Sequence, residues 1–290
     1  KKQSVYEMVT ERIISQLEQG IIPWEKPWSG ARSGAYNRII KKPYSLLNQL
    51  LLKHDGEYAT FAQWKNLGGK IRKGEKSEII TFWKVLPIEE EKADGTKEEK
   101  LIPFLRYYNV FHVSQVEGVE PLTVNLNEEI EPIEEADKIL NDYITREGIN
   151  LEHMISDKAY YSPTSDKIHL PLLEQFKNVN EYYSTAFHEA THSTMTKDRC
   201  DRKQEIKLLE FGSEDYSKEE LVAEMGSAFI MNSLGLETVG TFKNSTAYIQ
   251  SWITVLRNDV KFVVSASSKA EKAVKYILNK KKKNKRVYLR

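Results

Sequence analysis

The chain has little cysteine and no long apolar run. Cys200 is the only cysteine among 290 residues, which excludes a disulfide framework and any cysteine-based zinc cluster. A single thiol fits a reducing compartment, so we expect a cytoplasmic protein. No apolar run approaches the roughly 18 residues that a membrane span requires, and no signal-peptide pattern opens the chain. We therefore expect no membrane partner.

The net charge of +1 conceals a strong segregation of charge along the chain. Residues 1–88 carry a net charge of +7, residues 89–136 carry −9, residues 137–279 carry −4 and residues 280–290 carry +7. Four of the five tryptophans also lie within the first 88 residues. Because composition and charge change together, the chain is predicted to hold two domains with different tasks.

The spacing of apolar residues predicts an α+β protein with two domains and a mainly helical C-terminal part. Helices are expected over 4–19, 45–53, 60–67, 133–147, 180–194, 217–234, 244–264 and 269–279. Strands over 79–86 and 101–113 are expected to form a hairpin, with the charged run 89–100 as its solvated tip. Two short strands are expected within 159–171, around a turn at Ser165 and Asp166. The predicted domains are 1–125, which ends in an acidic linker (117–131), and 126–279, followed by a basic tail (280–290).

One motif carries clear chemistry. His188, Glu189 and His192 form the pattern H-E-x-x-H within the expected helix 180–194. Residues four apart lie on one helix face, so both imidazoles can reach one metal ion, with Glu189 beside it as a proton acceptor for a bound water. Zinc is the expected ion, with manganese or another divalent metal as the alternative. The simpler interpretation of two structural histidines is weakened by the apolar helix around them and by acidic residues downstream.

A catalytic metal site needs a third protein ligand. Glu220 and Glu224 lie on one face of the expected helix 217–234, so Glu220 is the favoured ligand and Glu224 is expected to accept the outer N–H of a ligating histidine. Glu224 as the ligand is an alternative. Asp198, six residues after His192, is another, but Met195 stands where the sharp turn of that arrangement needs glycine.

A peptidase also needs a hydrogen-bond donor for the oxyanion that develops in the reaction. Tyr216, just before the Glu220 helix, is the first candidate, and Tyr160 and Tyr161 are weaker ones. The segment 160–171 is expected to offer an edge strand that aligns an extended peptide.

Aromatic and basic residues alternate in the first 88 residues, which is typical of a platform for single-stranded nucleic acid. For any one ring, burial in the core is the competing interpretation. The residues predicted to bind DNA are Trp24, Lys26, Trp28, Arg38, Lys41, Lys42, Tyr44, Trp64, Lys70, Arg72, Lys73 and Lys76.

Several stretches together resemble the ArdC-type antirestriction proteins of conjugative plasmids and other mobile elements. The matching stretches are LEQGIIPWEKPW (17–28), KKPYSLLN (41–48), GGKIRKGEK (68–76), YYNVFHVSQVEG (107–118), FHEATHST (187–194) and YSKEELVAE (216–224). The resemblance implies an N-terminal domain that binds single-stranded DNA and a zincin-like metallopeptidase domain. It further implies that His188 and His192 bind the metal, that Glu189 is the catalytic carboxylate, and that a glutamate of EELVAE is the third ligand.

The expected function is therefore protection of incoming mobile-element DNA from restriction, by a protein that binds single-stranded DNA and carries a zinc peptidase site. An unknown protein substrate or a component of the restriction system is the expected second partner. One alternative is a DNA-binding protector whose metal site is structural or vestigial. Another is a peptidase whose N-terminal module binds protein.

Overall fold

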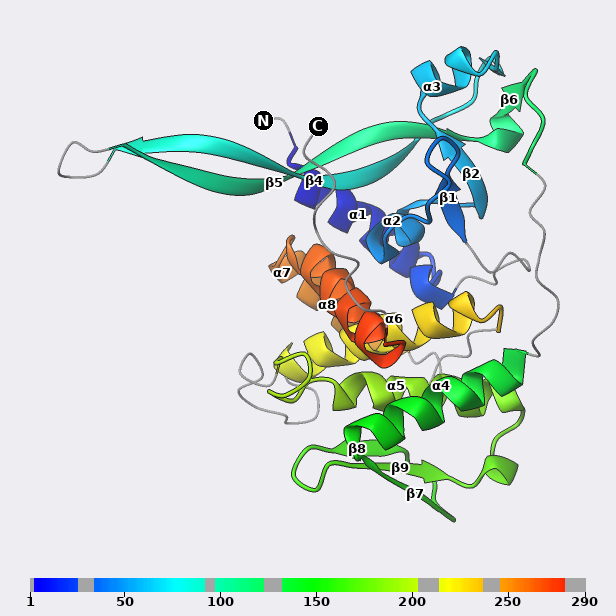
Figure 1. Cartoon of the computed structure of the whole chain (residues 1–290), viewed down its shortest axis with the longest axis vertical. Coiled ribbons are helices and arrows are strands. Elements are labelled where there is room, and N and C mark those ends of the chain that lie inside the picture. The colour runs from blue at the N-terminus through cyan, green and yellow to red at the C-terminus, as the bar shows by residue number, and fades with distance from the viewer. Residues whose placement is uncertain are drawn as a thin grey trace.

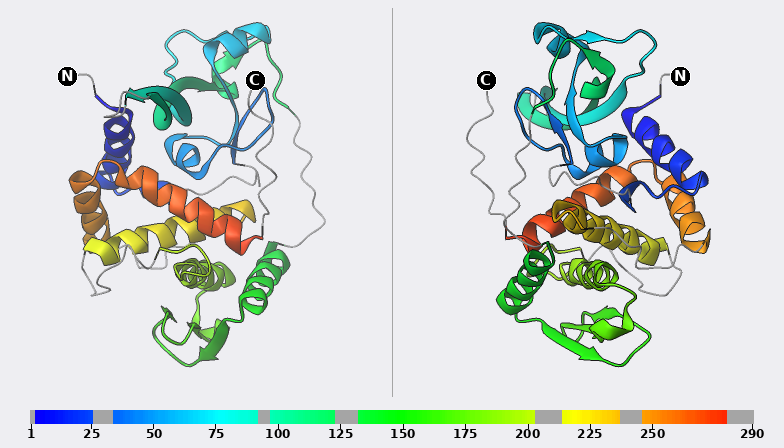
Figure 2. Two further views of the ribbon diagram at one scale, coloured as in Figure 1. Left: turned by 60° about the vertical axis from the view of Figure 1, so that its left-hand side comes forward. Right: turned by 90° about the vertical axis from the view of Figure 1, so that its right-hand side faces the viewer.

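The structure is a computed structural model that describes residues 3–25, 34–91, 97–122, 132–202, 214–236 and 246–279. It has the predicted two-domain mixed α+β architecture (Figures 1 and 2). Strands dominate the N-terminal part after its first helix, and helices dominate the C-terminal part.

The N-terminal part is built around a four-stranded sheet with the order β1-β2-β5-β4. Its strands are β1 (Ala35–Asn37), β2 (Gly56–Ala59), β4 (Glu78–Glu91) and β5 (Lys97–His112), and a small second sheet pairs β3 (Lys70–Ile71) with β6 (Val116–Glu117). The helical elements are α1 (Val5–Glu18), η1 (Pro23–Glu25), α2 (Leu46–Leu51), α3 (Phe61–Asn66) and η2 (Val113–Gln115). Ser4 and Thr60 begin α1 and α3 through capping boxes, which confirms two predicted helix starts.

The β4/β5 hairpin is longer than predicted. The antiparallel register runs without interruption from Glu78↔Val110 to Glu91↔Lys97, so most of the charged run 89–100 belongs to paired strands. Main-chain ladder bonds do not depend on side-chain polarity, and the apolar part of the hairpin fixes the register that the charged part continues. The centre of the expected tip, residues 92–96, lies outside the described residues. Figure 1 shows this two-stranded ribbon extending well beyond the rest of the sheet.

The C-terminal part packs helices over a three-stranded sheet with the order β7-β9-β8. Its elements are α4 (Pro132–Glu147), β7 (Asn150–Met154), β8 (Tyr160–Ser162), β9 (Lys167–Pro171), η3 (Leu173–Gln175), α5 (Val179–Ser193), α6 (Glu214–Ser233), α7 (Thr246–Asn258) and α8 (Phe262–Ile277). The side chain of Asn178 caps α5 by accepting from the Glu181 amide at 2.9 Å.

Two predicted boundaries differ from the structure. The predicted helix 244–264 is divided, because α7 ends at Asn258 and α8 begins at Phe262. The carboxylate of Asp259 accepts from the Lys261 amide at 2.9 Å, a local bond that competes with continued helix. The predicted linker 117–131 begins in part as strand β6, while its residues 123–131 lie outside the described part of the chain.

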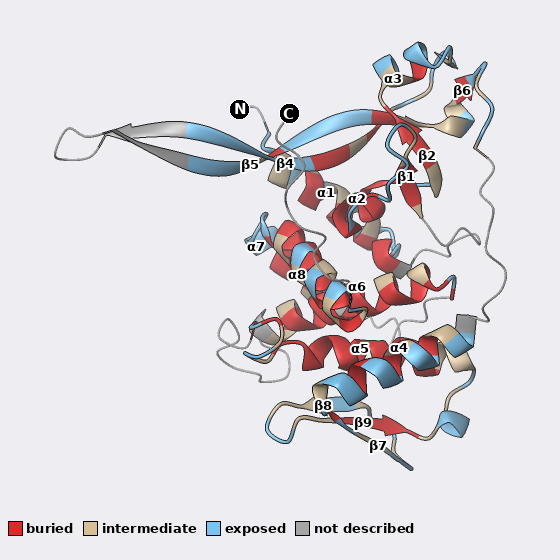
Figure 3. Ribbon diagram, viewed as in Figure 1, coloured by how far each residue is buried: buried red, intermediate tan, exposed pale blue. Residues whose placement is uncertain are grey.

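Helix α6 joins two apolar cores. Its first half contributes Leu221 and Met225 to a core shared with α1, α2, α7 and α8, and its second half contributes Met231 to a core shared with α4, α5 and β9. Figure 3 shows α5 and α6 as largely buried, whereas the described middle part of the β4/β5 ribbon is mostly exposed. Within the described residues, no helix is both long and apolar enough to cross a membrane.

Candidate metal centre

The candidate site forms where α5 and α6 approach each other very closely. A Cβ placed on Gly226 of α6 would lie 2.6 Å from Cγ2 of Thr191 on α5, so only glycine fits at this contact. The Ser227 hydroxyl also donates to the Ser184 carbonyl at 2.6 Å, which fixes the two helices against each other. The acidic face of α6 is thereby held against the histidine face of α5.

His188, His192 and Glu220 meet at this crossing. The two Nε2 atoms lie 3.0 Å apart, and each lies 3.4 Å from an oxygen of Glu220. The three side chains therefore offer one ligand atom each within a single small space. Asp198, the alternative third ligand, is exposed on the loop after α5 and is not part of this group.

The spacing of these three atoms suits a divalent ion. Zinc with ligands at about 2.0–2.1 Å and tetrahedral angles separates its ligand atoms by about 3.3–3.4 Å, and angles nearer 90° bring them to about 3.0 Å. Both Glu220 Oε2 and His192 Nδ1 are buried without a hydrogen-bond partner among the described residues. Buried polar atoms are rarely left unpaired, so the unpaired oxygen at the centre of the group fits a metal ligand.

Two further carboxylates face the outer nitrogens of the histidines. Glu224 lies 3.5 Å from His188 Nδ1, the position that the sequence analysis predicts for it. Glu219 lies 3.5 Å from His192 Nδ1. Glu219 was not among the predicted site residues, because the helix dipole alone explains a glutamate in the first turns of a helix.

Glu219 is held in turn by a buried arginine. Arg202 is 4% exposed and donates to both carboxylate oxygens of Glu219, at 2.6 and 3.1 Å. It also donates to the Thr194 hydroxyl at 2.7 Å and to the Thr191 carbonyl at 3.0 Å. Arg202 thus connects the end of α5 to α6 and fixes the carboxylate beside His192.

The pKa values of the group reflect its burial and mutual charge. Burial disfavours the charged imidazoles, but the facing carboxylates outweigh it, so the pKa of His188 is raised and that of His192 is raised well above its usual value. Burial acts against the ionised carboxylates, yet the two histidines hold the pKa of Glu220 far below its ordinary value. The ionised Glu220 therefore favours positive charge at the two histidine nitrogens that face it.

Glu189 has the opposite environment. It is 6% exposed, and burial raises its pKa despite the nearby histidines. A backbone hydrogen bond from Tyr161 of β8 partly offsets this rise. A carboxylate with a raised pKa is better suited to accept and return a proton near neutral pH.

The candidate tyrosines are distributed differently. Tyr216 is half-buried in the first turn of α6 and lies one turn before Glu220 on the same helix face. The Tyr161 hydroxyl donates to Asp166 at 2.8 Å, whereas Tyr160 is 48% exposed and stacks on His169. Of the three candidates, only Tyr216 lies on the helix that carries Glu220.

The aromatic residues predicted to bind DNA lie mainly in cores. Trp24 is 1% exposed and contacts Trp252, and Trp64 is fully buried with its Nε1 donating to the Phe111 carbonyl at 2.9 Å. Tyr44 is also buried, so these three rings have no face open to a base. Lys26 and Trp28 lie outside the described residues.

The predicted cations are mostly at the surface. Arg38 is the main exception, since it is half-buried and paired with Glu57. Arg72 is exposed but paired with Glu75. The remaining exposed cations are Lys41, Lys42, Lys70, Lys73 and Lys76. Apart from Phe61 on α3, the large exposed rings of the N-terminal part lie on the β4/β5 ribbon, at Phe82, Trp83, Tyr107 and Tyr108. The register shows that Phe82 and Tyr108 share one face of the ribbon and that Trp83 and Tyr107 share the other.

Residues 135–269 match the family of zincin-like metallopeptidases, and residues 3–111 match the N-terminal domain of the anti-restriction factor ArdC. The metal-free crystal structure of the ArdC protein from plasmid R388 superposes with a TM-score of 0.74 at 34% identity, covering 94% of this chain and 96% of that one. The chain belongs to the ArdC family of antirestriction proteins. The Mn(II)-bound R388 structure gives a TM-score of 0.75 at 32% identity, covering 96% and 98%.

Other members of this sequence group differ in length. The uncharacterised protein y4eC of Sinorhizobium fredii is 33% identical over 92% of this chain and 89% of its own length. Two DNA primases named TraC from Escherichia coli are 33% and 32% identical over 96% of this chain. The chain spans only 20% and 27% of those two primases, so this ArdC-like stretch is one part of much larger proteins.

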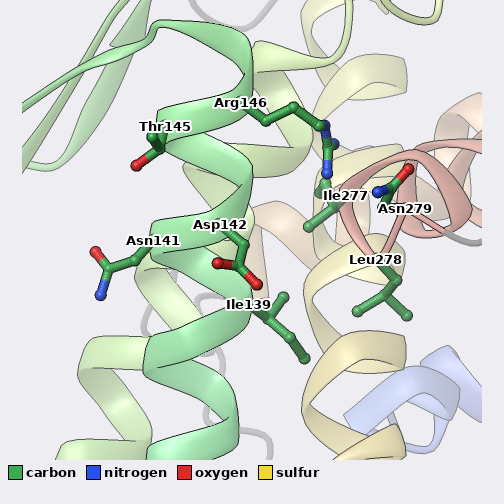
Figure 4. Close-up of a pocket in the computed structure, with 8 residues that line it drawn as sticks. All are labelled: Ile139, Asn141, Asp142, Thr145, Arg146, Ile277, Leu278 and Asn279. Atoms are coloured by element: carbon green, nitrogen blue, oxygen red, sulfur yellow. The ribbon is translucent and has the colours of Figure 1, made fainter.

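A large groove lies away from the candidate metal centre, between the ribbon and α8, and a smaller pocket lies between α4 and the end of α8 (Figure 4). The smaller pocket contains none of the metal-group residues. Its Arg146 is already bonded to Glu147 and to the Tyr276 carbonyl, so this pocket adds nothing to the site.

Proposed function

We propose that this protein protects incoming mobile-element DNA from restriction, by binding single-stranded DNA through its N-terminal domain and carrying a zinc-dependent peptidase site. The close grouping of His188, His192 and Glu220 supports the metal site most directly. The action is assigned to the cytoplasm, where entering DNA meets restriction enzymes.

Each residue of the site would have its own role in peptide cleavage. His188, His192 and Glu220 would hold the ion, with Glu224 and Glu219 orienting the two imidazoles. A bound zinc ion supplies a water with a pKa near 7 and polarises a carbonyl. Glu189 would take the proton of the attacking water and return it to the leaving amine, as its raised pKa favours. Tyr216 would donate to the developing oxyanion.

The edge strand β8 supports a peptide as the substrate. It is the edge of its sheet and adjoins Glu189 through the Tyr161 amide. An extended peptide can add to such an edge by main-chain bonds, which would bring its scissile carbonyl towards Glu189. The substrate of this reaction would be a protein of the cell that the mobile element enters, such as a component of its restriction system.

Metal content and binding test the site. The purified protein should hold about one equivalent of a divalent metal, and His188→Ala should abolish this binding. His153→Ala is the matched control. His153 lies on β7, is bonded to Tyr182 and is not part of the metal group. Metal content of about zero in the wild-type protein would exclude the proposed centre.

Glu189→Gln separates chemistry from DNA binding. The variant should retain the metal and the DNA affinity while losing peptide cleavage. If peptidase chemistry is the mechanism, protection of conjugated DNA in a restricting host should fall to the level of the empty vector. Undiminished protection would favour the second candidate, a DNA-binding protector that needs no proteolysis.

One observation weighs against a purely structural metal. The metal-free and Mn(II)-bound R388 structures match this chain about equally, with TM-scores of 0.74 and 0.75. A fold that is similar with and without the ion does not depend on it, as a structural zinc site usually would.

A further inference from the structure

A long groove runs between the base of the β4/β5 ribbon and α8. Its volume is about 1020 Å³, at the upper end of the range for ligand sites. One wall comes from the ribbon, with Phe82 and Trp83, and the opposite wall comes from α8, with Lys272 and Lys275. The segment before α2, which includes Lys42, closes the end between them.

Phe82 and Trp83 both line the groove, but as neighbours on a strand they point to opposite faces of the ribbon. Cross-strand pairing places Phe82 opposite Arg106 and Lys84 opposite Phe104, with Tyr108 next along the same face. The Phe82 and Tyr108 rings contact edge to face at 5.9 Å, and the Arg106 guanidinium lies 5.1 Å above the Phe104 ring. Aromatic and cationic side chains therefore alternate along this face.

These rings are not part of a core. Phe82 is 45% exposed, Trp83 53% and Tyr108 44%, whereas Trp24 and Trp64 are buried. Figure 3 shows the described part of the ribbon as mostly exposed. Phe82 and Tyr108 share one face of the ribbon and Trp83 lies on the other, and exposed apolar side chains grouped in this way mark an interaction site.

The charge around the groove favours an anionic occupant. Lys42, Lys272 and Lys275 line it, and Arg106 and Lys84 continue the positive charge along the ribbon. Glu271 is the one acidic residue among those lining the groove in the described structure, and it is paired with Lys275. Three lysines against one glutamate leave the lining net positive.

We propose that single-stranded DNA lies along the Phe82 face of the ribbon and passes around its β4 edge into the groove, so that α8 contacts the same strand as the N-terminal domain. Unpaired bases would stack on Phe82 and Tyr108, and the lysines of α8 would contact phosphates. This inference rests on the proposed binding of single-stranded DNA and assigns its location. It also gives the metallopeptidase part a role in DNA binding, since α8 packs against α6, which carries Glu220.

The ribbon is tested by fluorescence anisotropy of the full chain with a labelled oligothymidylate of ~20 nucleotides, longer than one binding site. Phe82→Ala should weaken binding by about 5- to 100-fold, the usual effect of removing one stacking ring. Phe61→Ala is the matched control, because Phe61 is 59% exposed on α3 and lies outside the groove. Weak binding of a duplex of equal length should change little with either variant.

The contribution of α8 is tested by the dependence of binding on salt. Lys272→Gln together with Lys275→Gln should reduce the slope of log K against log salt by about 0.7 for each lysine that contacts a phosphate. Lys138→Gln on α4 is the control for an exposed lysine elsewhere, and its slope should equal that of the wild type.

The outcomes are distinguishable. If the wild type binds the oligonucleotide and Phe82→Ala binds equally well, or loses duplex affinity to the same extent, the proposed location is overturned while DNA binding stands. If the ribbon variant weakens binding and the α8 variants keep the wild-type slope, the shared path is overturned. If the wild type does not bind, the proposed function itself fails.

Discussion

The candidate metal centre and the ribbon hold their side chains in opposite environments, one buried and one exposed. At the candidate centre, charged groups are buried and face one another, as Arg202 holds Glu219 and Glu219 faces His192. On the ribbon, aromatic and basic side chains project from two strands with little packed against them. We therefore expect substitutions at the centre to reduce stability and metal binding together. Substitutions on the ribbon should reduce only the proposed binding of DNA.

The largest expected effect is at Arg202. Arg202→Met leaves the buried carboxylate of Glu219 unpaired, and we expect a loss of about 3–5 kcal/mol in the free energy of unfolding. Metal affinity should also fall, because the group that positions His192 is released. Denaturant unfolding and metal competition measure the two effects.

A matched exposed pair controls for loss of an arginine. Arg257 pairs with Glu18 at the surface, where the two side chains are 58% and 48% exposed. Arg257→Met should change stability by less than about 1 kcal/mol. Equal effects at Arg202 and Arg257 would contradict the view of the centre as a tightly constrained site.

The next largest effect is at Gly226. In a helix, alanine normally stabilises relative to glycine by about 1 kcal/mol. Here we expect Gly226→Ala to destabilise by about 1–3 kcal/mol, because its Cβ would overlap Thr191 and separate α5 from α6. Thermal unfolding measures the sign directly.

Relief of the overlap is the control. The double variant Gly226→Ala with Thr191→Ala removes the two Thr191 atoms, Cγ2 and Oγ1, that lie 2.6 and 2.8 Å from the new Cβ. It should recover part of the loss, a coupling that a double-mutant cycle detects. Simple additivity would show that close approach of the helices is not the cause.

A smaller and pH-dependent effect is expected at Asp166. This carboxylate accepts from Arg199 at 2.6 and 2.8 Å, and those hydrogen bonds lower its pKa. Because the folded pKa is the lower one, its stabilisation is complete above the ordinary value of about 4 and is lost as pH falls through the folded value. The side chain is 39% exposed, so solvent screening limits the contribution to about 1 kcal/mol.

Melting temperatures of the wild type and Asp166→Asn at pH 7 and pH 3 measure this contribution. Asparagine tolerates the positive φ of 46° at this position, so backbone strain should not obscure the result. The two proteins should differ at pH 7 and approach each other at pH 3. A difference that grows on acidification would reverse the assigned sign.

The smallest stability effect is expected on the ribbon. Phe82→Ala should change the free energy of unfolding by no more than about 0.5 kcal/mol, because surface positions contribute little. Trp64→Ala, at a fully buried ring, should cost about 3–5 kcal/mol. Chemical denaturation of both variants tests whether the ribbon is as tolerant as its exposure indicates.

The grouping of His188, His192 and Glu220 could be anticipated from the sequence because helix geometry is local, while their binding of a metal stays a prediction. The spacing of His188 and His192 places both on one face of α5, and the spacing of Glu220 and Glu224 does the same on α6. The crossing of the two helices depends on tertiary packing, yet the shared acidic face made Glu220 the favoured partner. Glu219 and Arg202 escaped prediction because their contact joins α6 to a loop seventeen residues earlier.

The proposed DNA-binding surface was harder to predict, because composition does not distinguish a buried ring from an exposed one. Trp24 and Trp64 follow the same alternation with cations as Phe82 and Trp83, and only the folded chain separates the two pairs by burial. The length of the ribbon was likewise underestimated, since a charged run can continue a strand ladder whose register is fixed elsewhere. Most helix boundaries were predicted closely, because caps such as Ser4 and Thr60 are local signals.

The core that α6 shares with α1 and α2 joins the two parts of the chain into one packed unit. Cutting between them would expose Leu17 and Leu50 on one side and Leu221 and Leu256 on the other, all of which are nearly inaccessible to water in the intact chain. Separation of the two parts would leave two aggregation-prone fragments. The two TraC primases match both parts together, over 96% of this chain.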